Sequence, residues 1–234
     1  MMKKVLITGS TKGIGFECAK YFMQNGFSVI AHYNNENDNL NTIKKNGMNQ
    51  CINCDFSNDD AFNNFLQKVR SLEIEALVNN AGMYDFSKNQ DNRIESIEKL
   101  FKVNIIAPVL LSEAVMDGMK KRKHGHIINI SSIGAKYGSN SNNIFYGVSK
   151  RGIESATKTL AREGAKYNIL VNTIRPGITN TDFVKNLGKD IKKRIELIPL
   201  KRAMEPVELA KFIFYMCTEN TFITNEIITI AGGE

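Results

Sequence analysis

The sequence lacks tryptophan and any long apolar segment, and it has only four prolines. No apolar run approaches the roughly 18 residues needed to span a bilayer, so we expect no membrane-spanning helix. The first ten residues, MMKKVLITGS, carry two lysines but only a short apolar run, and they lack the apolar region and the cleavage site of a signal peptide. We therefore expect a cytoplasmic protein.

Cysteine and histidine are also scarce, with four and three residues respectively. Disulfides are uncommon in a reducing compartment. Cys51 and Cys54 have the CxxC spacing found in metal and redox sites, but the sequence has no second CxxC, and its histidines form no ligand pattern with the first. Both cysteines lie in a short strand-like run, so we expect them to be structural and expect no metal site.

Basic residues outnumber acidic ones, which gives a net charge of +7 and a pI of about 9.1. This excess favours an acidic partner or substrate. The densest basic run is KKRKHGH at 120–126, where cations suit the C-terminal end of a helix dipole. Nucleic acid is a less favoured partner, because no interleaved aromatic residues and no recognition motif accompany the run.

Strand-like apolar runs alternate with helical patterns along the whole chain. Most of these runs are continuous, which is typical of strands buried on both faces of a parallel sheet between helices. The composition does not change along the 234 residues, so we predict a single-domain, doubly wound α/β fold over 1–234. Its seven parallel strands are predicted at 4–8, 28–33, 51–55, 75–80, 126–131, 169–174 and 226–231.

A glycine-rich loop, TGSTKGIG at 8–15, directly follows the first predicted strand and opens the first helix. Glycine permits a tight turn and close approach of the backbone to a phosphate. The helix N-terminus adds free amide donors and a partial positive charge. A glycine pattern alone is a weak signal, but its position between the first strand and the first helix predicts a dinucleotide-binding loop.

The glycine spacing is GxxxGxG, which resembles that of the short-chain dehydrogenase/reductase family. Further motifs of that family follow in order on the expected elements, and they are NNAG at 79–82, Asn104 in FKVNIIAP, NISS at 129–132, YGVSK at 146–150 and RPG at 175–177. The resemblance implies a Rossmann fold, a nicotinamide cofactor and a mobile lid over the substrate at about 182–204. Overall the chain is most similar to the 3-oxoacyl-acyl-carrier-protein reductases of fatty acid biosynthesis.

The residues after the second strand predict which nicotinamide cofactor is bound. An acidic residue there would bond the ribose 2′-hydroxyl and repel a 2′-phosphate, but the chain has Tyr33 and Asn34 at this point. Lys12 occupies the loop position at which the resemblance implies a contact to the 2′-phosphate. We therefore predict NADP(H). The alternative is that Lys12 faces solvent and Glu36 turns inward to bind NAD.

The resemblance also implies the remaining cofactor contacts. The glycine loop would hold the phosphates, the second and third strand ends would hold the adenosine, and the loop after the sixth strand would hold the nicotinamide. The predicted cofactor-binding residues are Gly9, Ser10, Thr11, Lys12, Gly13, Ile14, Tyr33, Asn34, Asp55, Phe56, Asn79, Ala81, Gly82, Tyr146, Lys150, Pro176, Gly177, Ile178 and Thr181.

Tyr146 and Lys150 are four residues apart, so they share one face of a helix. A nearby ammonium favours the phenolate and would lower the pKa of Tyr146, which could then exchange a proton with a substrate. Ser132 is predicted to polarise the substrate oxygen, with Ser131 as its competitor. The resemblance implies that Asn104 is a fourth catalytic residue, which organises a water that relays protons to Lys150.

The resemblance implies reduction of a 3-oxoacyl thioester carried by an acidic acyl carrier protein, which would dock near Lys123, and a homotetramer. A reductase of another carbonyl (a sugar, quinone, small ketone or polyketide-type acyl chain) would keep the same site. A non-catalytic dinucleotide-binding regulator is the alternative from another class. Two positions depart from the family pattern, because Arg175 and Ala231 stand where a small residue and an aspartate are usual.

Overall fold

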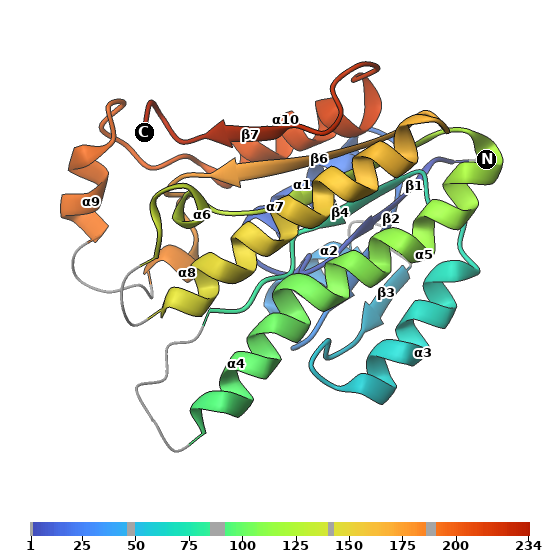
Figure 1. The fold of residues 1–234 in the computed structure, drawn as a ribbon, viewed down its shortest axis with the longest axis horizontal. Helices are drawn as coiled ribbons and strands as arrows, with labels where there is room; N and C mark the ends of the chain where they lie inside the picture. The colour runs from blue at the N-terminus through green and yellow to red at the C-terminus, as the bar shows by residue number, and fades with distance from the viewer. Residues whose placement is uncertain (1, 46–49, 85–91, 140–142, 186–190) are drawn as a thin grey trace.

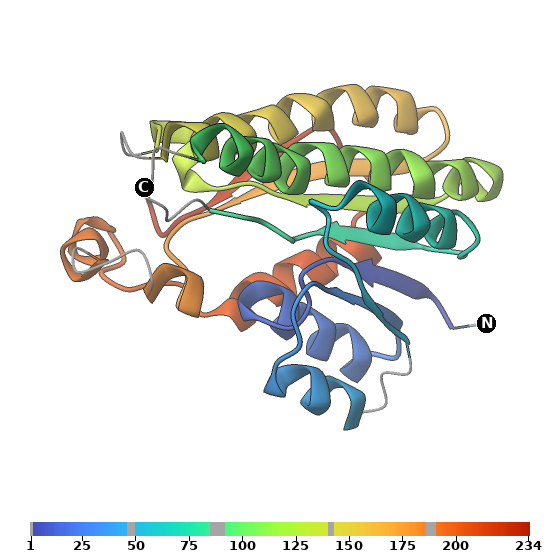
Figure 2. The same cartoon turned by 90° about the horizontal axis from the view of Figure 1, so that it is seen from below.

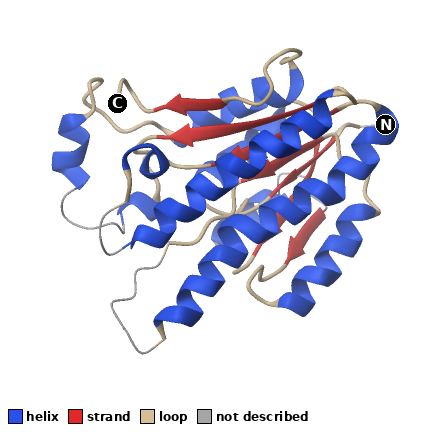
Figure 3. Ribbon diagram, viewed as in Figure 1, coloured by secondary structure: helices blue, strands red, loops and turns tan. Residues whose placement is uncertain are grey.

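The structure is a computed structural model that describes residues 2–45, 50–84, 92–139, 143–185 and 191–234. It contains a seven-stranded sheet in which every neighbouring pair is parallel, with the order β3-β2-β1-β4-β5-β6-β7. This arrangement confirms the predicted doubly wound Rossmann fold (Figures 1 and 3). The strands are β1 (Lys4–Ile7), β2 (Ser28–Tyr33), β3 (Gln50–Asn53), β4 (Ala76–Asn79), β5 (Gly125–Ile130), β6 (Ile169–Pro176) and β7 (Ile227–Ile230).

Helices cover both faces of the sheet, and α1 and α10 lie on the opposite side from α3, α5 and α7 (Figure 2). None of the helices within the described ranges is long and apolar enough to cross a bilayer. The helices are α1 (Gly13–Gln24), α2 (Asp38–Lys45), α3 (Asp59–Arg70), α4 (Arg93–Phe101), the π-helix η1 (Lys102–Ile106), α5 (Ala107–Arg122), α6 (Ile133–Tyr137), α7 (Ile144–Ala165), α8 (Asp182–Lys185), α9 (Ile191–Leu197) and α10 (Pro206–Thr218).

The two apolar cores explain the continuous apolar runs in the strands. Successive side chains of a strand point to opposite faces, so Leu6 enters the core under α3, α5 and α7, whereas Val5 and Ile7 enter the core under α1 and α10. Helices therefore cover both faces of the central strands, whereas the edge strands β3 and β7 are only partly buried.

The carboxyl ends of the strands meet along one edge of the sheet. The strand order reverses between β1 and β4, which are paired through Ile7 and Val78. Loops that leave this point in opposite directions open a crevice, and open α/β sheets bind ligands there. The glycine loop follows β1 and NNAG follows β4, so the fold brings both motifs to this crevice.

Candidate active site

The glycine loop forms a backbone cradle at the start of α1. Gly9 and Gly13 have φ values of 65° and 50°, which glycine adopts readily and other residues rarely do. A Cβ atom on Gly15 would lie 2.2 Å from the carbonyl oxygen of Gly9, so no larger residue fits. Lys12 is the N-cap of α1, and its side chain does not bond the first turn of the helix. The free amides of that turn suit a pyrophosphate.

His32 supports this loop, and sequence reasoning missed it. The backbone N–H of Gly9 donates to His32 Nδ1 over 3.2 Å, and Nε2 pairs with the carbonyl oxygen of Cys54 over 2.9 Å. The ring also stacks on Phe56 at a centroid distance of 4.0 Å. Burial lowers the pKa of His32 to about 4, so the ring is neutral and can accept from Gly9. The only sequence signal is a polar residue inside the buried run SVIAHY.

Further neutral groups hold the loop in place. Ser10, a predicted cofactor contact, is fully buried, and its hydroxyl donates to the carbonyl oxygens of Ile7 and His32. The amides of Asn37 and Asn39 both donate to the carbonyl oxygen of Thr11. The segment after β2 is therefore tied to the glycine loop by contacts that no sequence motif indicates.

The predicted adenosine contacts lie at the ends of β2 and β3. Lys12 and Asn34 are exposed, whereas Tyr33 and Phe56 are buried. The Asp55 carboxylate accepts from the backbone N–H and the hydroxyl of Ser57, at 2.8 and 2.7 Å. Asp55 thus caps the turn before α3, and its contact with the adenine stays a prediction.

The two asparagines of NNAG contact different parts of the structure. The buried Asn79 amide donates to Ser112 and Asn129, so its side chain serves the sheet and only its backbone can meet a cofactor. The Asn80 amide donates to the carbonyl oxygens of Thr8 and Gly9, at 2.9 and 3.1 Å. Asn80 was not among the predicted site residues, yet it fastens the glycine loop to the end of β4.

The Thr8 hydroxyl oxygen accepts from the backbone N–H groups of Asn80 and Ala81, at 3.0 and 2.9 Å. Ala81 and Gly82, both predicted cofactor contacts, follow directly. A Cβ atom on Gly82 would lie 3.2 Å from the Nζ of Lys150. The NNAG segment therefore lies between the glycine loop and the lysine of YGVSK.

Asn104 is buried in the π-helix η1, a rare geometry that is often found at functional sites. Its Oδ1 accepts from the Met83 backbone N–H over 2.7 Å, and its Nδ2 donates to the Met83 carbonyl oxygen over 2.8 Å. The same Nδ2 donates to the Ser149 hydroxyl over 3.0 Å. Asn104 thereby joins the loop after β4 to α7, and its role in a water relay stays a prediction.

The two serines of NISS are distinguished by their contacts. The buried Ser131 hydroxyl donates to Glu154 over 2.7 Å and lies 3.1 Å from the carbonyl oxygen of Lys150. Ser132 is the N-cap of α6, where its Oγ accepts from the Gly134 N–H. Ser132 also shares a hydrogen bond with Tyr146. This geometry favours Ser132 over Ser131 as the catalytic serine.

The predicted lowering of the Tyr146 pKa is not found, because burial acts in the opposite direction. Burial raises the pKa of Tyr146 to about 12, against an opposing contribution from Ser132. Burial also lowers the pKa of Lys150 to about 8. The lysine Nζ donates to the carbonyl oxygen of Ile130 over 3.0 Å and lies 5.9 Å from the centre of the tyrosine ring. Desolvation therefore outweighs attraction, and Tyr146 is a protonated acid.

Two aromatic side chains lie close to the ring of Tyr146. The Tyr84 ring lies 4.9 Å from the Tyr146 ring and 5.7 Å from the Phe183 ring. Phe183 belongs to α8, the first part of the predicted lid at 182–204. The lid continues in α9 and reaches Met204, which pairs with Thr179. Residues 186–190 of the lid lie outside the described residues.

The loop after β6 is positioned by its neighbours. The Gly177 N–H donates to the carbonyl oxygen of Ile230 over 2.8 Å, and the carbonyl oxygen of Ile178 accepts from Met204. A Cβ atom on Gly177 would lie 2.8 Å from both the Cα and the Cβ of Ala231, so only glycine fits at 177. A Cβ atom on Gly13 would lie 3.0 Å from the Thr181 methyl group. Pro176 through Thr181 therefore lie beside the glycine loop.

Metal ligation finds no support in the ranges that the structure describes, because no three His, Cys, Asp or Glu side chains there form a group that could hold an ion. Cys51 and Cys54 are free thiols. Burial raises the pKa of both, that of Cys54 to about 11, so neither is an activated nucleophile.

Comparison with known proteins agrees with this geometry. The family model described as short chain dehydrogenase matches residues 3–192. The acetoacetyl-CoA reductase of Acinetobacter sp. is 31% identical over 99% of this chain and 97% of its own length. The 3-oxoacyl-[acyl-carrier-protein] reductase FabG of Aquifex aeolicus is 32% identical over 99% and 96%. A 4-hydroxyisoleucine dehydrogenase complexed with NADH superposes with a TM-score of 0.90 at 30% identity, covering 99% of this chain and 98% of its own.

The chain belongs to the short-chain dehydrogenase/reductase family. It is an oxidoreductase that acts on CH–OH and C=O groups with a nicotinamide dinucleotide, as a carbonyl reductase of that family.

Proposed function

We propose that the protein reduces a 3-oxoacyl thioester, carried by an acyl carrier protein, to its 3-hydroxyacyl form with NADPH. The observation that carries this proposal is that the buried Tyr146 shares a hydrogen bond with Ser132, so that both hydroxyl groups can meet one substrate oxygen. Full-length similarity to two thioester reductases supports the substrate class. An NADPH-consumption screen over acyl thioesters, ketones and quinones tests it, and turnover of ketones but not of acetoacetyl thioesters would contradict the assignment.

The cradle fits a dinucleotide. The pyrophosphate would meet the glycine loop and the free amides of α1, the nicotinamide ribose would meet Tyr146 and Lys150, and the carboxamide would meet Pro176 to Thr181. A nicotinamide dinucleotide bound there supplies the hydride to the substrate.

The side chains supply the proton. Negative charge develops on the carbonyl oxygen during reduction, and the Ser132 hydroxyl donates a hydrogen bond to it. Tyr146 then gives its phenolic proton to that oxygen. Lys150, whose pKa is lowered by burial to about 8, exchanges protons near neutral pH and can return one to the phenolate. Asn104 holds the segment after β4 against α7, which keeps this path closed around the substrate.

The preference for NADPH rests on Lys12, exposed at the N-cap of α1, and on Asn34 at the end of β2. We expect a higher kcat/KM for NADPH than for NADH, and we expect Lys12→Glu to lower the value for NADPH about tenfold or more. Lys3→Glu at the opposite edge of the sheet is the matched control and should change neither value. A wild-type preference for NADH would show that Glu36 turns inward and would refute the assignment.

The acidic carrier would dock at Lys123, which ends α5 in the left-handed conformation and is exposed. Raising the salt concentration and making Lys123→Glu should each increase KM for the carrier-bound substrate several-fold, because exposed charges are screened. The same acyl group on a small thiol is the control and should respond to neither change. A KM for the carrier-bound substrate that ignores both changes would contradict docking at Lys123.

A second candidate is reduction of a smaller or aromatic ketone, which the rings of Tyr84 and Phe183 beside Tyr146 favour. The substrate screen separates the two candidates.

We also propose a homotetramer, and light scattering of the purified chain measures its mass.

A further inference from the structure

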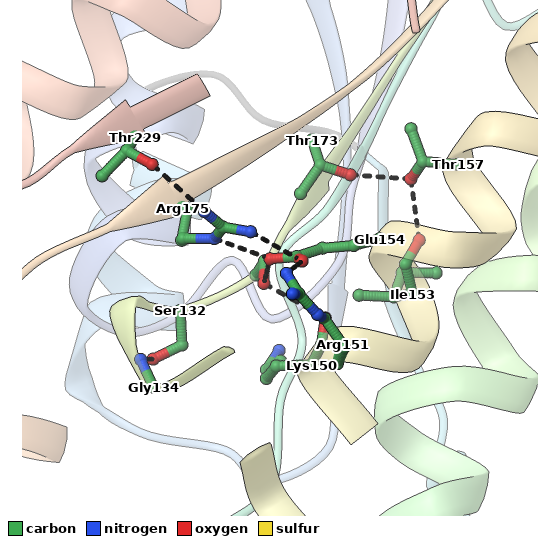
Figure 4. A network of polar contacts seen from close by, with 11 residues as sticks. Ser132, Gly134, Lys150, Arg151, Ile153, Glu154, Thr157, Thr173, Arg175 and Thr229 are labelled. Carbon is green, nitrogen blue, oxygen red and sulfur yellow. Dashed lines mark hydrogen bonds and ion pairs between the residues drawn. The ribbon is translucent and has the colours of Figure 1, made fainter. Parts of the chain in front are cut away.

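A buried ion pair lies beside the proposed reaction centre. Glu154 follows Lys150 by one turn of α7 and is only 1% exposed, and Arg175 on β6 is 8% exposed. The Nε and Nη2 atoms of Arg175 each donate to the Glu154 carboxylate over 2.8 Å, and the two side chains face each other in Figure 4. Two parallel bonds of this kind give strict geometry as well as attraction.

The pair also holds other elements of the site. The Ser131 hydroxyl donates to Glu154 Oε1 over 2.7 Å and lies within 3.1 Å of the Lys150 carbonyl oxygen. Thr229 on β7 accepts from Arg175 Nη1 over 3.4 Å (Figure 4). One carboxylate therefore joins the end of β5, a turn of α7 and the end of β6, and the arginine extends the network to β7.

Three members of this network lie within one helical turn or one residue of a predicted site residue. Ser131 precedes Ser132, Glu154 lies one turn from Lys150, and Arg175 precedes the Pro176–Gly177 segment. Within the described part of the chain, Glu154 and Arg175 bond Ser131, Arg151, Thr229 and each other, and not the Tyr146 hydroxyl. The pair can thus act on the reaction only through the residues that it holds.

The network has a defined charge. Burial works to raise the pKa of Glu154, but hydrogen bonds from Arg175, Ser131 and Arg151 outweigh it and lower the pKa, so the carboxylate is ionised. Arg151 reaches the same carboxylate over 3.0 Å, and its side chain is 63% exposed. The buried pair is therefore neutral as a unit, and removing either partner leaves a buried charge of known sign.

Resting on the carbonyl reductase function proposed above, we propose that Glu154 and Arg175 are positioning residues for its reaction centre. They hold Ser131 and the Lys150 turn of α7 against β6, and their opposite charges leave no net charge beside that turn. This role explains Arg175, the arginine that stands where the family usually has a small residue.

Titration of Lys150 tests the charge balance without any substrate or cofactor. Protein labelled with [ε-¹³C]lysine gives a lysine signal that Lys150→Arg removes, and its chemical shift against pH reports the protonation of Lys150. The Tyr146 ring lies 5.9 Å from Lys150 Nζ, with Tyr84 packed against that ring. The Glu154 carboxylate is joined to the Lys150 carbonyl oxygen through Ser131, and it carries Arg151 and Arg175 as its charged partners.

The two single variants should move this titration in opposite directions. Glu154→Gln leaves the Arg175 cation and should lower the midpoint of Lys150, whereas Arg175→Met leaves the carboxylate and should raise it, each by about one pH unit. A merely structural pair would weaken folding in both variants without shifts of opposite sign. Midpoints that stay within about 0.3 units of the wild type, or that move the same way in both, would overturn the proposal.

Three further variants separate charge from geometry. Arg151→Gln removes the exposed arginine from the same carboxylate and should shift the midpoint only slightly, because its charge is screened by water. The double variant Glu154→Gln/Arg175→Met should return the midpoint close to the wild-type value. Arg175→Lys keeps the charge but loses the two-bond fork, so it should keep the midpoint while kcat falls several-fold. If Arg175→Met does not fold, the comparison of the Lys150 midpoint in Glu154→Gln with that in Arg151→Gln tests the proposal by itself.

Activity gives the second measurement. With a reducible carbonyl substrate, the pH dependence of kcat should move with the Lys150 midpoint in each variant, while the dissociation constant of NADPH changes less than threefold. A wild-type chain that reduces no carbonyl would refute the proposed function, and the NMR titration would still decide the positioning pair. A wild-type chain that reduces its substrate, with variants whose titrations do not diverge, would refute only the pair.

Discussion

The two ends of the site hold buried polar groups in different ways. At the nucleotide end, the glycine loop is held by neutral partners, namely Ser10, His32 and Asn80. At the reaction end, the buried groups are charged or titratable, namely Tyr146, Lys150, Glu154 and Arg175. The backbone amides and the helix N-terminus that would bind a charged ligand do not change their charge with pH. The groups that would transfer a proton have pKa values that depend on their surroundings.

Tyr146→Phe should separate the two ends most sharply. Loss of the phenolic proton should lower kcat by about 10³-fold or more, since the substrate oxygen then lacks its acid. The glycine loop is untouched, so the dissociation constant of NADPH, measured by fluorescence, should stay within a few-fold of the wild type. A variant that reduces substrate at the wild-type rate would remove tyrosine from the mechanism.

Gly15→Ala should damage the nucleotide end. The new Cβ would lie 2.2 Å from the Gly9 carbonyl oxygen, so the loop must move, and we expect NADPH to bind about 100-fold more weakly, measured by calorimetry. Gly118→Ala in α5 is the matched control, because its Cβ meets only the flexible end of Arg122. The control should bind NADPH normally. Normal binding by Gly15→Ala would show that the cradle does not hold the phosphates.

His32 should give the smallest effect, which appears as a pH dependence of stability. Its folded pKa of about 4 lies below the ordinary value of 6.5, so the unfolded chain binds the proton more tightly. The contribution of His32 to stability is complete above pH 6.5 and falls as the pH drops toward 4, by about 3 kcal/mol in total.

Urea denaturation of the wild type and His32→Gln between pH 7 and pH 4 measures this contribution. The free energy of unfolding should fall more steeply with acid in the wild type than in His32→Gln. Equal slopes in the wild type and His32→Gln would mean that His32 is not buried as a neutral ring.

Sequence reasoning located the elements and the motif residues but not the contacts between motifs. The seven strands were predictable because continuous apolar runs are required where both faces are buried, as Val5, Leu6 and Ile7 illustrate. The positions of Ser132, Tyr146 and Lys150 followed from motif order. Asn80 and His32 escaped because their partners, Gly9 and Cys54, lie 71 and 22 residues away along the chain, and no local pattern encodes such pairings.

The protonation of Tyr146 could not be predicted from the sequence for a related reason. The spacing of Tyr146 and Lys150 in YGVSK places an ammonium near the phenol but carries no information about desolvation. Burial of both side chains reverses the expected sign, raising the pKa of the tyrosine and lowering that of the lysine. The same limit applied to Arg175, whose partner Glu154 became evident only when β6 and α7 were placed together.

The central claim is that Tyr146 donates a proton that Lys150 then replaces. The steady-state kcat of NADPH oxidation at saturating acetoacetyl thioester, measured from pH 6 to pH 10, tests it most directly. We expect a kcat that is constant near pH 6 and declines through about pH 8, where Lys150 has lost half of its protons. A rate that rises through this range would identify a base in place of an acid and would contradict the mechanism.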